Sequence, residues 1–205
     1  MRLVVQEFMS LDGVVQAPSY PDEDTSAGFT RGGWNIPYMD EDALRWTIEG
    51  VQSADAYLFG RGTFEMFAKH WPNASPAQAP PPLAEPLNSR PKFVASTTLR
   101  EPLGWSHAQL LKGDVVQAVR DKKHSTKGTL LCIGSPGLAR TLLEADLVDE
   151  LRVMIDPLLL GSGKRALPEG SALRRFEVKS SRATRLGAIL ATYTRAKDPA
   201  RKEAA

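Results

Sequence analysis

Residues 129–144 read TLLCIGSPGLARTLLE, and this stretch decides the fold. Its first five residues form an apolar, partly β-branched run that stops at Gly134. Pro136 then stands where a helix accepts proline, in the first turn, and leucines follow at helical spacing. The stretch therefore predicts a buried strand that turns at once into a helix packed on the sheet.

A second junction of this kind lies in residues 54–66, ADAYLFGRGTFEM, where the apolar run stops at Gly60 before a helical pattern. Further strands are predicted over 2–9, 92–96 and 108–113, and further helices from a cap at Asp40 and over 114–128. Repeated strand–helix alternation predicts an α/β sheet of mostly parallel order with helices on both faces.

The rest of the chain departs from this alternation. Residues 176–196 alternate apolar and polar side chains around a glycine turn, which predicts an antiparallel hairpin at the sheet edge. Residues 149–161 predict a long bent strand region with Pro157 at a bend or an edge. The proline-rich residues 72–82 predict a surface loop. We expect a single domain over residues 1–195 and a disordered tail over 196–205.

Composition excludes several classes of protein. The 205 residues carry a net charge of +2, which the basic tail accounts for, so no nucleic-acid partner is predicted. No apolar stretch is long enough for a membrane span, and the N-terminus lacks the apolar core of a secretory signal. A cytoplasmic location is therefore expected. The single Cys132 reads as a core residue, and the three histidines are too scattered to predict a metal site.

The two glycine junctions are candidates for anion binding. A helix N-terminus exposes unpaired N–H groups, and the side chains of Arg61 and Thr63 can bind phosphate oxygens. Alone, Gly60–Thr63 is better interpreted as a plain turn with a solvated arginine. Together with residues 134–137 it becomes a stronger candidate, because ligands of open α/β sheets bind at the carboxyl ends of strands. Two such junctions could hold separate phosphates of one dinucleotide.

Other polar segments also follow predicted strands. Ser96-Thr97-Thr98 could meet a phosphate or a ribose, although such a turn can equally satisfy its own backbone. Ser10 and Asp12 follow the first strand, and Asp12 could hydrogen-bond a substrate. Trp34 lies in an unusually long loop over 14–38 and could stack on a planar ring. The alternative is a turn aspartate and a tryptophan that pins the loop to the core.

Taken in order, these segments resemble the dihydrofolate reductase-like superfamily, specifically proteins similar to the C-terminal reductase domain of bifunctional riboflavin biosynthesis enzymes. The matching pieces are MSLDGVV, LFGRGTFE, KFVASTTL, residues 130–163 and the closing hairpin. The resemblance implies a central, mostly parallel twisted sheet flanked by helices. It also implies NADPH as cofactor, with NADH possible, hydride transfer to a small heterocyclic or carbonyl substrate, and a homodimer.

The same resemblance assigns roles to individual residues. The residues implied to bind the cofactor are Gly60, Arg61, Gly62, Thr63, Ser96, Thr97, Gly134, Ser135, Gly137 and Leu138. Asp12 would face the substrate near the nicotinamide and supply the proton if it is protonated, with ordered water as the alternative. Ser10 and Trp34 would contact the substrate.

Two departures from the family pattern qualify these roles. Relatives often carry Ser-Arg where this chain has Ser96-Thr97, so one partner of the cofactor 2′-phosphate is missing, and Arg61 or Arg140 could replace it. Folate reductases carry an acid on their first helix, near the position of Leu44 here, so reduction of dihydrofolate is not expected. The leading hypothesis is an NADPH-dependent reductase. The alternative is a non-catalytic nicotinamide-nucleotide-binding or sensor protein.

Overall fold

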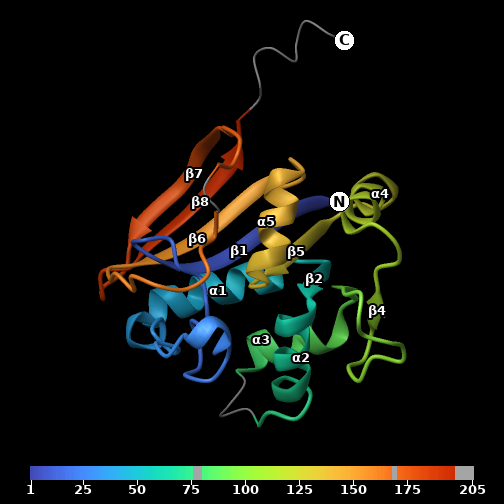
Figure 1. Ribbon diagram of the computed structural model, residues 1–205, viewed down its shortest axis with the longest axis horizontal. Helices are drawn as coiled ribbons and strands as arrows, with labels where there is room; N and C mark the ends of the chain where they lie inside the picture. The colour runs from blue at the N-terminus through green and yellow to red at the C-terminus, as the bar shows by residue number, and fades with distance from the viewer. Residues whose placement is uncertain (76–79, 168–169, 197–205) are drawn as a thin grey trace, which may run out of the picture.

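The computed structural model describes residues 1–75, 80–167 and 170–196, which form an α/β fold around one sheet. The eight strands described have the order β4-β3-β2-β5-β1-β6-β8-β7 (Figure 1). They are β1 (Arg2–Ser10), β2 (Ala56–Gly60), β3 (Lys92–Ala95), β4 (Ala108–Leu110), β5 (Thr129–Ile133), β6 (Glu150–Asp156), β7 (Phe176–Ala183) and β8 (Ile189–Arg195). Neighbours from β4 to β6 pair in parallel, whereas β8 pairs antiparallel with β6 and with β7. The mostly parallel sheet with its C-terminal antiparallel hairpin is therefore confirmed.

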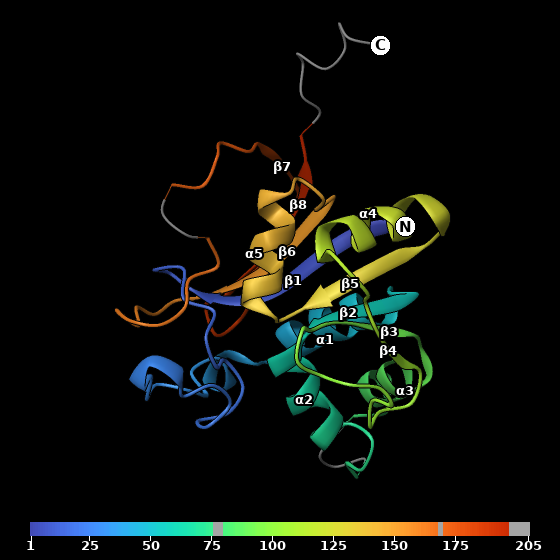
Figure 2. The same cartoon turned by 45° about the vertical axis from the view of Figure 1, so that its right-hand side comes forward.

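Helices cover both faces of the sheet, as expected for parallel strands joined by crossovers (Figure 2). They are α1 (Glu41–Gln52), α2 (Arg61–His70), α3 (Pro81–Ser89), α4 (Val115–Ser125) and α5 (Pro136–Glu144). The predicted cap of α1 is present, because the Asp40 side chain accepts a hydrogen bond from the Ala43 amide at 3.0 Å.

The central strands are buried on both faces, and this explains why their sequences are continuously apolar. On one face Val5 and Cys132 pack with Leu138 and Leu142 of α5. On the other face residues of β1, β2, β3 and β5 pack with α1, α2 and α3, and Tyr57 and its neighbours supply a group of aromatic rings. The prediction that Cys132 is a core residue is confirmed, since its side chain is fully buried.

Two predictions of local structure need correction. Residues 149–161 do not form one long bent strand region, because β6 ends at Asp156. Pro157 has no N–H for the strand ladder, and the chain leaves the sheet there as a loop. The loop predicted over 72–82 also ends early, because α3 begins at Pro81. Prolines are accepted in a first helical turn, and the buried Leu83 and Leu87 give α3 its apolar side.

Some expectations stay predictions. The tail residues 197–205 lie outside the described residues, and the domain limits, the homodimer and the cellular location stay predictions. Among the described residues, no helix combines the length and apolar character needed to cross a bilayer.

Candidate functional site

The predicted site residues follow neighbouring strands and gather at one edge of the sheet. In the order β3-β2-β5-β1, the strands end at Ala95, Gly60, Ile133 and Ser10. Because these strands are parallel, all four carboxyl ends open on the same edge, where ligands of α/β sheets bind. The structure therefore brings together the segments that follow these four strands, which sequence analysis could place only one by one.

The two glycine junctions are joined to each other by hydrogen bonds. The Gly60 amide donates to Ser135 Oγ at 2.9 Å, and the Ser135 amide donates to Thr63 Oγ1 at 3.0 Å. Each hydroxyl oxygen acts here as an acceptor and keeps its own O–H available as a donor. The first turns of α2 and α5 are thus held side by side, and both hydroxyls can still bind a ligand.

The first turns of α2 and α5 provide the space and the donors that an anion requires. A Cβ added at Gly62 or at Gly137 would meet no atom within 4 Å, so a ligand can approach the backbone closely at both positions. N–H groups in a first helical turn have no acceptor within the helix, and the positive ends of two helix dipoles meet here. Arg61 is exposed and is the first residue of α2.

Gly134 and Leu138 have structural roles at the same junction. Gly134 has a φ of +58°, a conformation that favours glycine, and its Cβ position lies 3.4 Å from the Thr63 side chain. The Leu138 side chain is 9% exposed and packs in the core. Any contact of Leu138 with a cofactor would therefore be made by its backbone.

The Ser96–Thr97 turn satisfies its own backbone, as the alternative interpretation proposed. Ser96 Oγ accepts hydrogen bonds from the amides of Thr98 at 3.2 Å and Leu99 at 3.0 Å. Thr97 is exposed, and the Arg100 guanidinium donates to the carbonyl oxygens of Thr97 and Leu99. Arg100 therefore places a cation on this turn that sequence analysis did not single out.

Asp12 is a loop anchor, and this corrects its predicted role as proton donor. Its carboxylate accepts hydrogen bonds from the Ser10 hydroxyl at 2.7 Å and from the amides of Leu160 at 3.1 Å and Gly161 at 2.8 Å. The Ser10 hydroxyl, followed by the two backbone amides, lowers the pKa of Asp12 to about 2, against a smaller opposing effect of burial. Asp12 is ionised at neutral pH and has no proton to give.

The side chains of Ser10 and Trp34 both make hydrogen bonds to the backbone of the loop. Ser10 is fully buried, and its Oγ also accepts a hydrogen bond from the Val14 amide at 3.0 Å. The Trp34 ring is 7% exposed, and its Nε1 donates to the Gln16 carbonyl oxygen at 2.7 Å. A ring so enclosed offers little surface for stacking, so the structure favours the alternative in which Trp34 pins the loop to the core.

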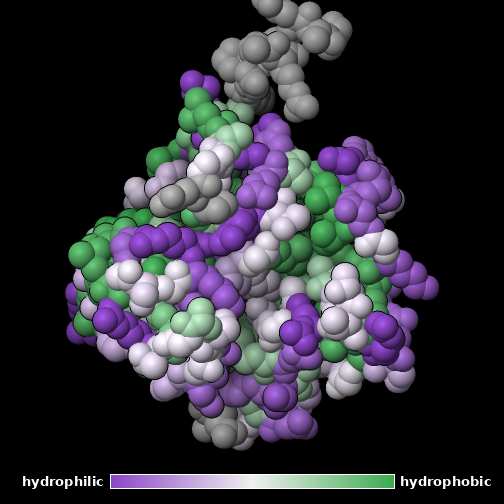
Figure 3. Space-filling model, viewed as in Figure 1, coloured by the Kyte–Doolittle hydropathy of each residue, from purple (hydrophilic) through white to green (hydrophobic). Residues whose placement is uncertain are grey.

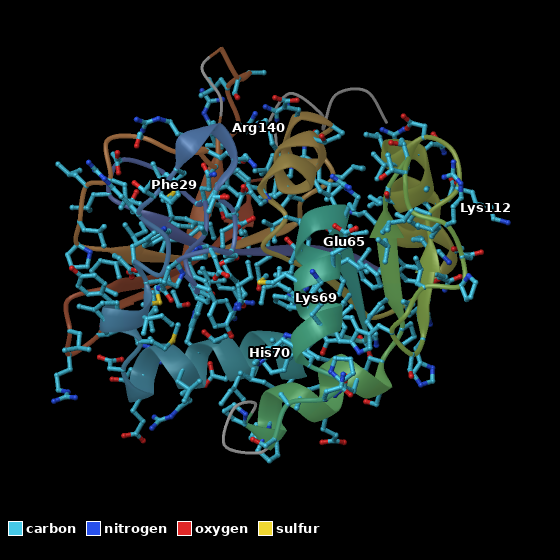
Figure 4. All side chains as sticks on the ribbon, turned by 60° about the horizontal axis from the view of Figure 1, so that its bottom comes forward. Phe29, Glu65, Lys69, His70, Lys112 and Arg140 are labelled. Carbon is cyan, nitrogen blue, oxygen red and sulfur yellow. The ribbon has the colours of Figure 1, made fainter. Side chains whose placement is uncertain are left out.

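The long loop over 14–38 reaches the C-terminal end of α2. The rings of Tyr20 and His70 lie with centroids 6.1 Å apart. Figure 4 shows Glu65, Lys69 and His70 along α2, with Phe29 of the loop across from them. In Figure 3 the region around the first turns of α5 and α2 has intermediate hydropathy, as glycine, serine and threonine give, beside hydrophilic side chains.

Glu7 is a candidate residue that sequence analysis missed. It lies on β1, is 6% exposed, and its Oε1 is buried with no hydrogen-bond partner among the described residues. Burial, with a contribution from the charge of Glu23, raises the pKa of Glu7 to about 8. The available signal was a carboxylate inside the apolar strand RLVVQEFM.

Asp156 is a second buried carboxyl, at the end of β6. Its Oδ2 accepts a hydrogen bond from Asn35 Nδ2 at 2.9 Å, and the Oδ1 atoms of both residues are buried with no partner among the residues that the structure describes. Burial raises the pKa of Asp156 to about 7, against the opposing effect of the Asn35 hydrogen bond. A protonated Asp156 would carry one O–H donor and could still accept the hydrogen bond from Asn35.

A hollow of about 560 Å³ lies apart from these residues, between β4 and α4. Its lining includes Phe93, Lys112, Asp114 and Lys122. None of the residues assigned above to the cofactor or the substrate lines this hollow.

Comparison with known proteins identifies the family. The family model described as the RibD C-terminal domain matches residues 2–190. The chain belongs to the RibD C-terminal domain family. The Bacillus subtilis protein YyaP, described as uncharacterized, is 24% identical over 163 residues, which are 80% of this chain and 78% of YyaP.

Solved structures related to the RibD C-terminal domain family share the fold. A Shewanella sp. PV-4 protein named for riboflavin biosynthesis superposes with a TM-score of 0.67 at 23% identity, covering 96% of this chain and all of its own. A pyrimidine reductase-like protein from Corynebacterium diphtheriae gives 0.56 at 14%, covering 96% of this chain and 92% of its own. A Thermotoga maritima diaminohydroxyphosphoribosylaminopyrimidine deaminase/5-amino-6-(5-phosphoribosylamino)uracil reductase gives 0.62 at 13%, covering 95% of this chain and 56% of its own. The expected dihydrofolate reductase-like fold is confirmed.

Proposed function

We propose that this protein is an NADPH-dependent reductase that transfers a hydride to a small heterocyclic or carbonyl substrate of the riboflavin-precursor type. The observation that carries this proposal is the hydrogen-bonded pair of junctions at Gly60–Thr63 and Gly134–Ser135. Two helix N-termini fixed side by side at adjacent parallel strands suit the two phosphates of a dinucleotide. Membership of the RibD C-terminal domain family supports the reaction class.

The residues present fit the pyrophosphate of such a cofactor. The hydroxyls of Thr63 and Ser135 can each donate one hydrogen bond, and Gly62 and Gly137 leave room at the backbone. The exposed Arg61 guanidinium can add a charge-assisted bond. Bound NADPH supplies the hydride, and the protein binds the cofactor, orients the substrate against it and excludes water.

Arg100 provides a cation for the 2′-phosphate that distinguishes NADPH from NADH. Its guanidinium donates to carbonyl oxygens of the turn that follows β3, and the last residue of β3, Ala95, pairs with Gly60. This is the turn where relatives often carry an arginine and this chain carries Thr97. Arg140 is less suited, because its Nη2 already donates to the Arg165 carbonyl oxygen and its Nε is buried without a partner.

The substrate is expected to differ from dihydrofolate. Leu44, at the position where folate reductases carry an acid, packs against the core beneath α1. Glu41, one turn earlier, is exposed and pairs with Arg45 at 2.9 Å. The Thermotoga maritima relative is named as a 5-amino-6-(5-phosphoribosylamino)uracil reductase, so an aminopyrimidine is the first substrate to test.

A second candidate function is nucleotide binding without turnover. Two observations favour it: Asp12 is held ionised, and α1 presents no acid to the site. In this case NADPH would bind to the same two junctions, at Gly60–Thr63 and Gly134–Ser135, and the protein would reduce none of the substrates tested.

Titration calorimetry with NADPH, NADH and riboflavin tests the binding proposal. We expect NADPH to bind most tightly, and Arg61→Ala to weaken it by about 1–3 kcal/mol through loss of a charged hydrogen bond. Arg45→Ala, a matched change on α1, should leave affinity unchanged. Equal NADPH affinity in wild type and Arg61→Ala would contradict the assignment of Arg61.

An assay of NADPH oxidation then distinguishes the reductase from the non-catalytic binding protein. The assay uses 5-amino-6-(5-phosphoribosylamino)uracil, dihydrofolate and a panel of aldehydes and ketones as substrates. Turnover of the aminopyrimidine would support the reductase. Tight NADPH binding without oxidation across the panel would favour the binding protein.

A further inference from the structure

Glu7 points to the face of the sheet that carries α5. Its neighbour Gln6 points to the opposite face, because Gln6 Oε1 accepts a hydrogen bond from Arg152 Nε at 2.9 Å and lies against Gly50 of α1. Successive side chains of a strand alternate between faces. Glu7 therefore follows Val5, which packs with α5, on the α5 face.

Glu7 also lies level with the glycine junction of β5. The Gly134 amide donates to the Gln6 carbonyl oxygen at 3.1 Å, so the next residue of β1 stands beside the Gly134–Ser135 turn. The loop over 14–38 brings Glu23 close enough to act electrostatically on Glu7. Glu7 thus lies between the Gly134–Ser135 turn and the loop over 14–38.

The surroundings of Glu7 keep its carboxyl protonated at neutral pH. Glu23 and Cys132 are the titratable groups that interact with it, and neither supplies a positive charge. Arg140 on α5 is directed instead to the Arg165 carbonyl oxygen. Burial raises the pKa of Glu7 to about 8, and its Oε1 is buried with no hydrogen-bond partner in the described part of the chain.

We propose that Glu7 is the catalytic acid of this reductase, in place of Asp12. This rests on the proposed function. As a hydride from NADPH forms the new C–H bond, the π electrons of the substrate C=N or C=O bond move to the heteroatom. That heteroatom takes the proton from the Glu7 carboxyl, which becomes a carboxylate and is reprotonated from water. The class of substrate is therefore one whose nitrogen or oxygen must gain a proton upon reduction.

Binding of NADP⁺ and NADPH tests the position of Glu7 without any substrate. Oxidised nicotinamide carries a positive charge and the reduced ring is neutral, while both forms share the same phosphates. Ionised Glu7 beside the ring should favour NADP⁺. We expect NADP⁺ affinity to rise at least about tenfold between pH 7 and pH 9.5, relative to NADPH.

Two variants show whether Glu7, and not another titrating group, causes the pH dependence of the NADP⁺/NADPH affinity ratio. Glu7→Gln keeps the size of the side chain and should remove the pH dependence of the NADP⁺/NADPH affinity ratio. Glu23→Gln removes the charge that helps to raise the pKa of Glu7, so the same rise should occur at lower pH. Carbon-13 NMR of the Glu7 carboxyl in the free protein should show a titration near pH 8 that Glu7→Gln lacks.

Kinetics on the first substrate found to be reduced complete the test. Single-turnover hydride transfer in Glu7→Gln should fall about 10²–10⁴-fold with NADPH affinity unchanged, and Glu7→Asp should restore part of the rate. The wild-type rate should fall as pH rises through 8, because the acid must be protonated. An affinity ratio independent of pH, or full activity in Glu7→Gln, would overturn the role of Glu7 alone. Failure of both nucleotides to bind would overturn the proposed function, and the role of Glu7 with it.

Discussion

The Ser135 hydroxyl accepts a hydrogen bond from the Gly60 amide at 2.9 Å, which joins two strand–helix junctions that are 75 residues apart in the chain. The Ser135 amide completes the connection by donating to Thr63 Oγ1 at 3.0 Å. The two junctions therefore form a cradle, one hydrogen-bonded unit in which each helix start fixes the position of the other. Stability and cofactor binding should depend on the same atoms.

Substitution of Ser135 tests this dependence. Ser135 is 6% exposed, so Ser135→Ala leaves the Gly60 amide without its acceptor in a partly buried position. We expect the free energy of unfolding to fall by about 1–2 kcal/mol. The loss is measured by urea denaturation at pH 7.

Thr63 supplies a matched pair of variants for the second bond. Thr63→Val removes the hydroxyl that accepts from the Ser135 amide and keeps the shape, whereas Thr63→Ser keeps the hydroxyl. Thr63→Val should destabilise by about 1 kcal/mol more than Thr63→Ser and should also weaken NADPH binding. Equal stability and affinity in the two variants would show that the hydroxyl contributes to neither.

The order and type of the main elements follow from local sequence, and the cradle could be anticipated for the same reason. Apolar runs that end at Gly60 and Gly134 show where strands give way to helices. The hydrogen bonds between these junctions could not be predicted, because they depend on β2 and β5 becoming neighbours in the sheet. Local patterns contain no information on pairing between segments so far apart.

Protonation states were beyond sequence reasoning for a related physical reason. Asp12 reads as a turn residue, but besides the nearby Ser10 hydroxyl the amides of the distant Leu160 and Gly161 help to lower its pKa below the ordinary value. Glu7 reads as a polar residue in a strand, but its raised pKa depends on burial under the distant α5 and the loop carrying Glu23. Such shifts arise from the three-dimensional environment, which a single sequence does not specify.

Substitution of Gly62 or Gly137 by alanine should weaken NADPH binding without lowering the stability of the fold. Gly62→Ala and Gly137→Ala add a methyl group in open space at ordinary helical positions, so stability should stay equal or rise by up to about 1 kcal/mol. The same methyl groups occupy the space through which phosphate would approach the backbone, so NADPH affinity should fall. Calorimetry and urea denaturation on the same samples measure the two effects.

Gly134→Ala is the contrasting control for the cradle. Gly134 has a φ of +58°, so alanine there is strained by about 1–2 kcal/mol in addition to any effect on binding. Undiminished NADPH affinity in both Gly62→Ala and Gly137→Ala would argue that phosphate does not bind at these backbone positions.

Asp156 should make the protein less stable as pH rises. Burial raises the pKa of Asp156 in the folded state to about 7 from the ordinary 3.8. Below pH 3.8 the carboxyl is protonated in both states and imposes no penalty. Between about pH 4 and pH 7 only the unfolded state loses its proton, so stability falls by up to about 1.4 kcal/mol per pH unit from this group.

Asp156→Asn imitates the protonated carboxyl, because its amide is neutral, can accept from Asn35 Nδ2 and carries N–H donors. At pH 4 we expect the variant and the wild type to unfold at similar urea concentrations. At pH 8 the variant should be more stable, by up to about 4 kcal/mol. Glu7 produces a similar trend, so the comparison is repeated in Glu7→Gln, where the effect of Asp156→Asn should persist. A pH-independent difference between variant and wild type would contradict a buried, protonated Asp156.

Asp40 joins the start of α1 to the turn of the C-terminal hairpin, and its substitution should weaken both. Its Oδ1 accepts from the Ala43 amide at 3.0 Å and its Oδ2 from the Leu186 amide at 3.2 Å. Asp40→Ala removes both bonds and should lower stability by about 2 kcal/mol. Asp40→Asn keeps one acceptor oxygen and should lose about half as much.

The effect of Asp40 should disappear in acid. Its backbone hydrogen bonds, first that of Ala43, hold the pKa of Asp40 below its ordinary value in the folded state. A lowered folded-state pKa stabilises the protein above the ordinary carboxyl pKa, and this contribution is lost as pH falls through the folded-state value. The stability difference between wild type and Asp40→Asn, measured by urea denaturation from pH 7 downward, should therefore shrink toward low pH. A difference that stayed constant to pH 2 would mean that the charge of Asp40 contributes nothing, and that the bonds to Ala43 and Leu186 act only through their geometry.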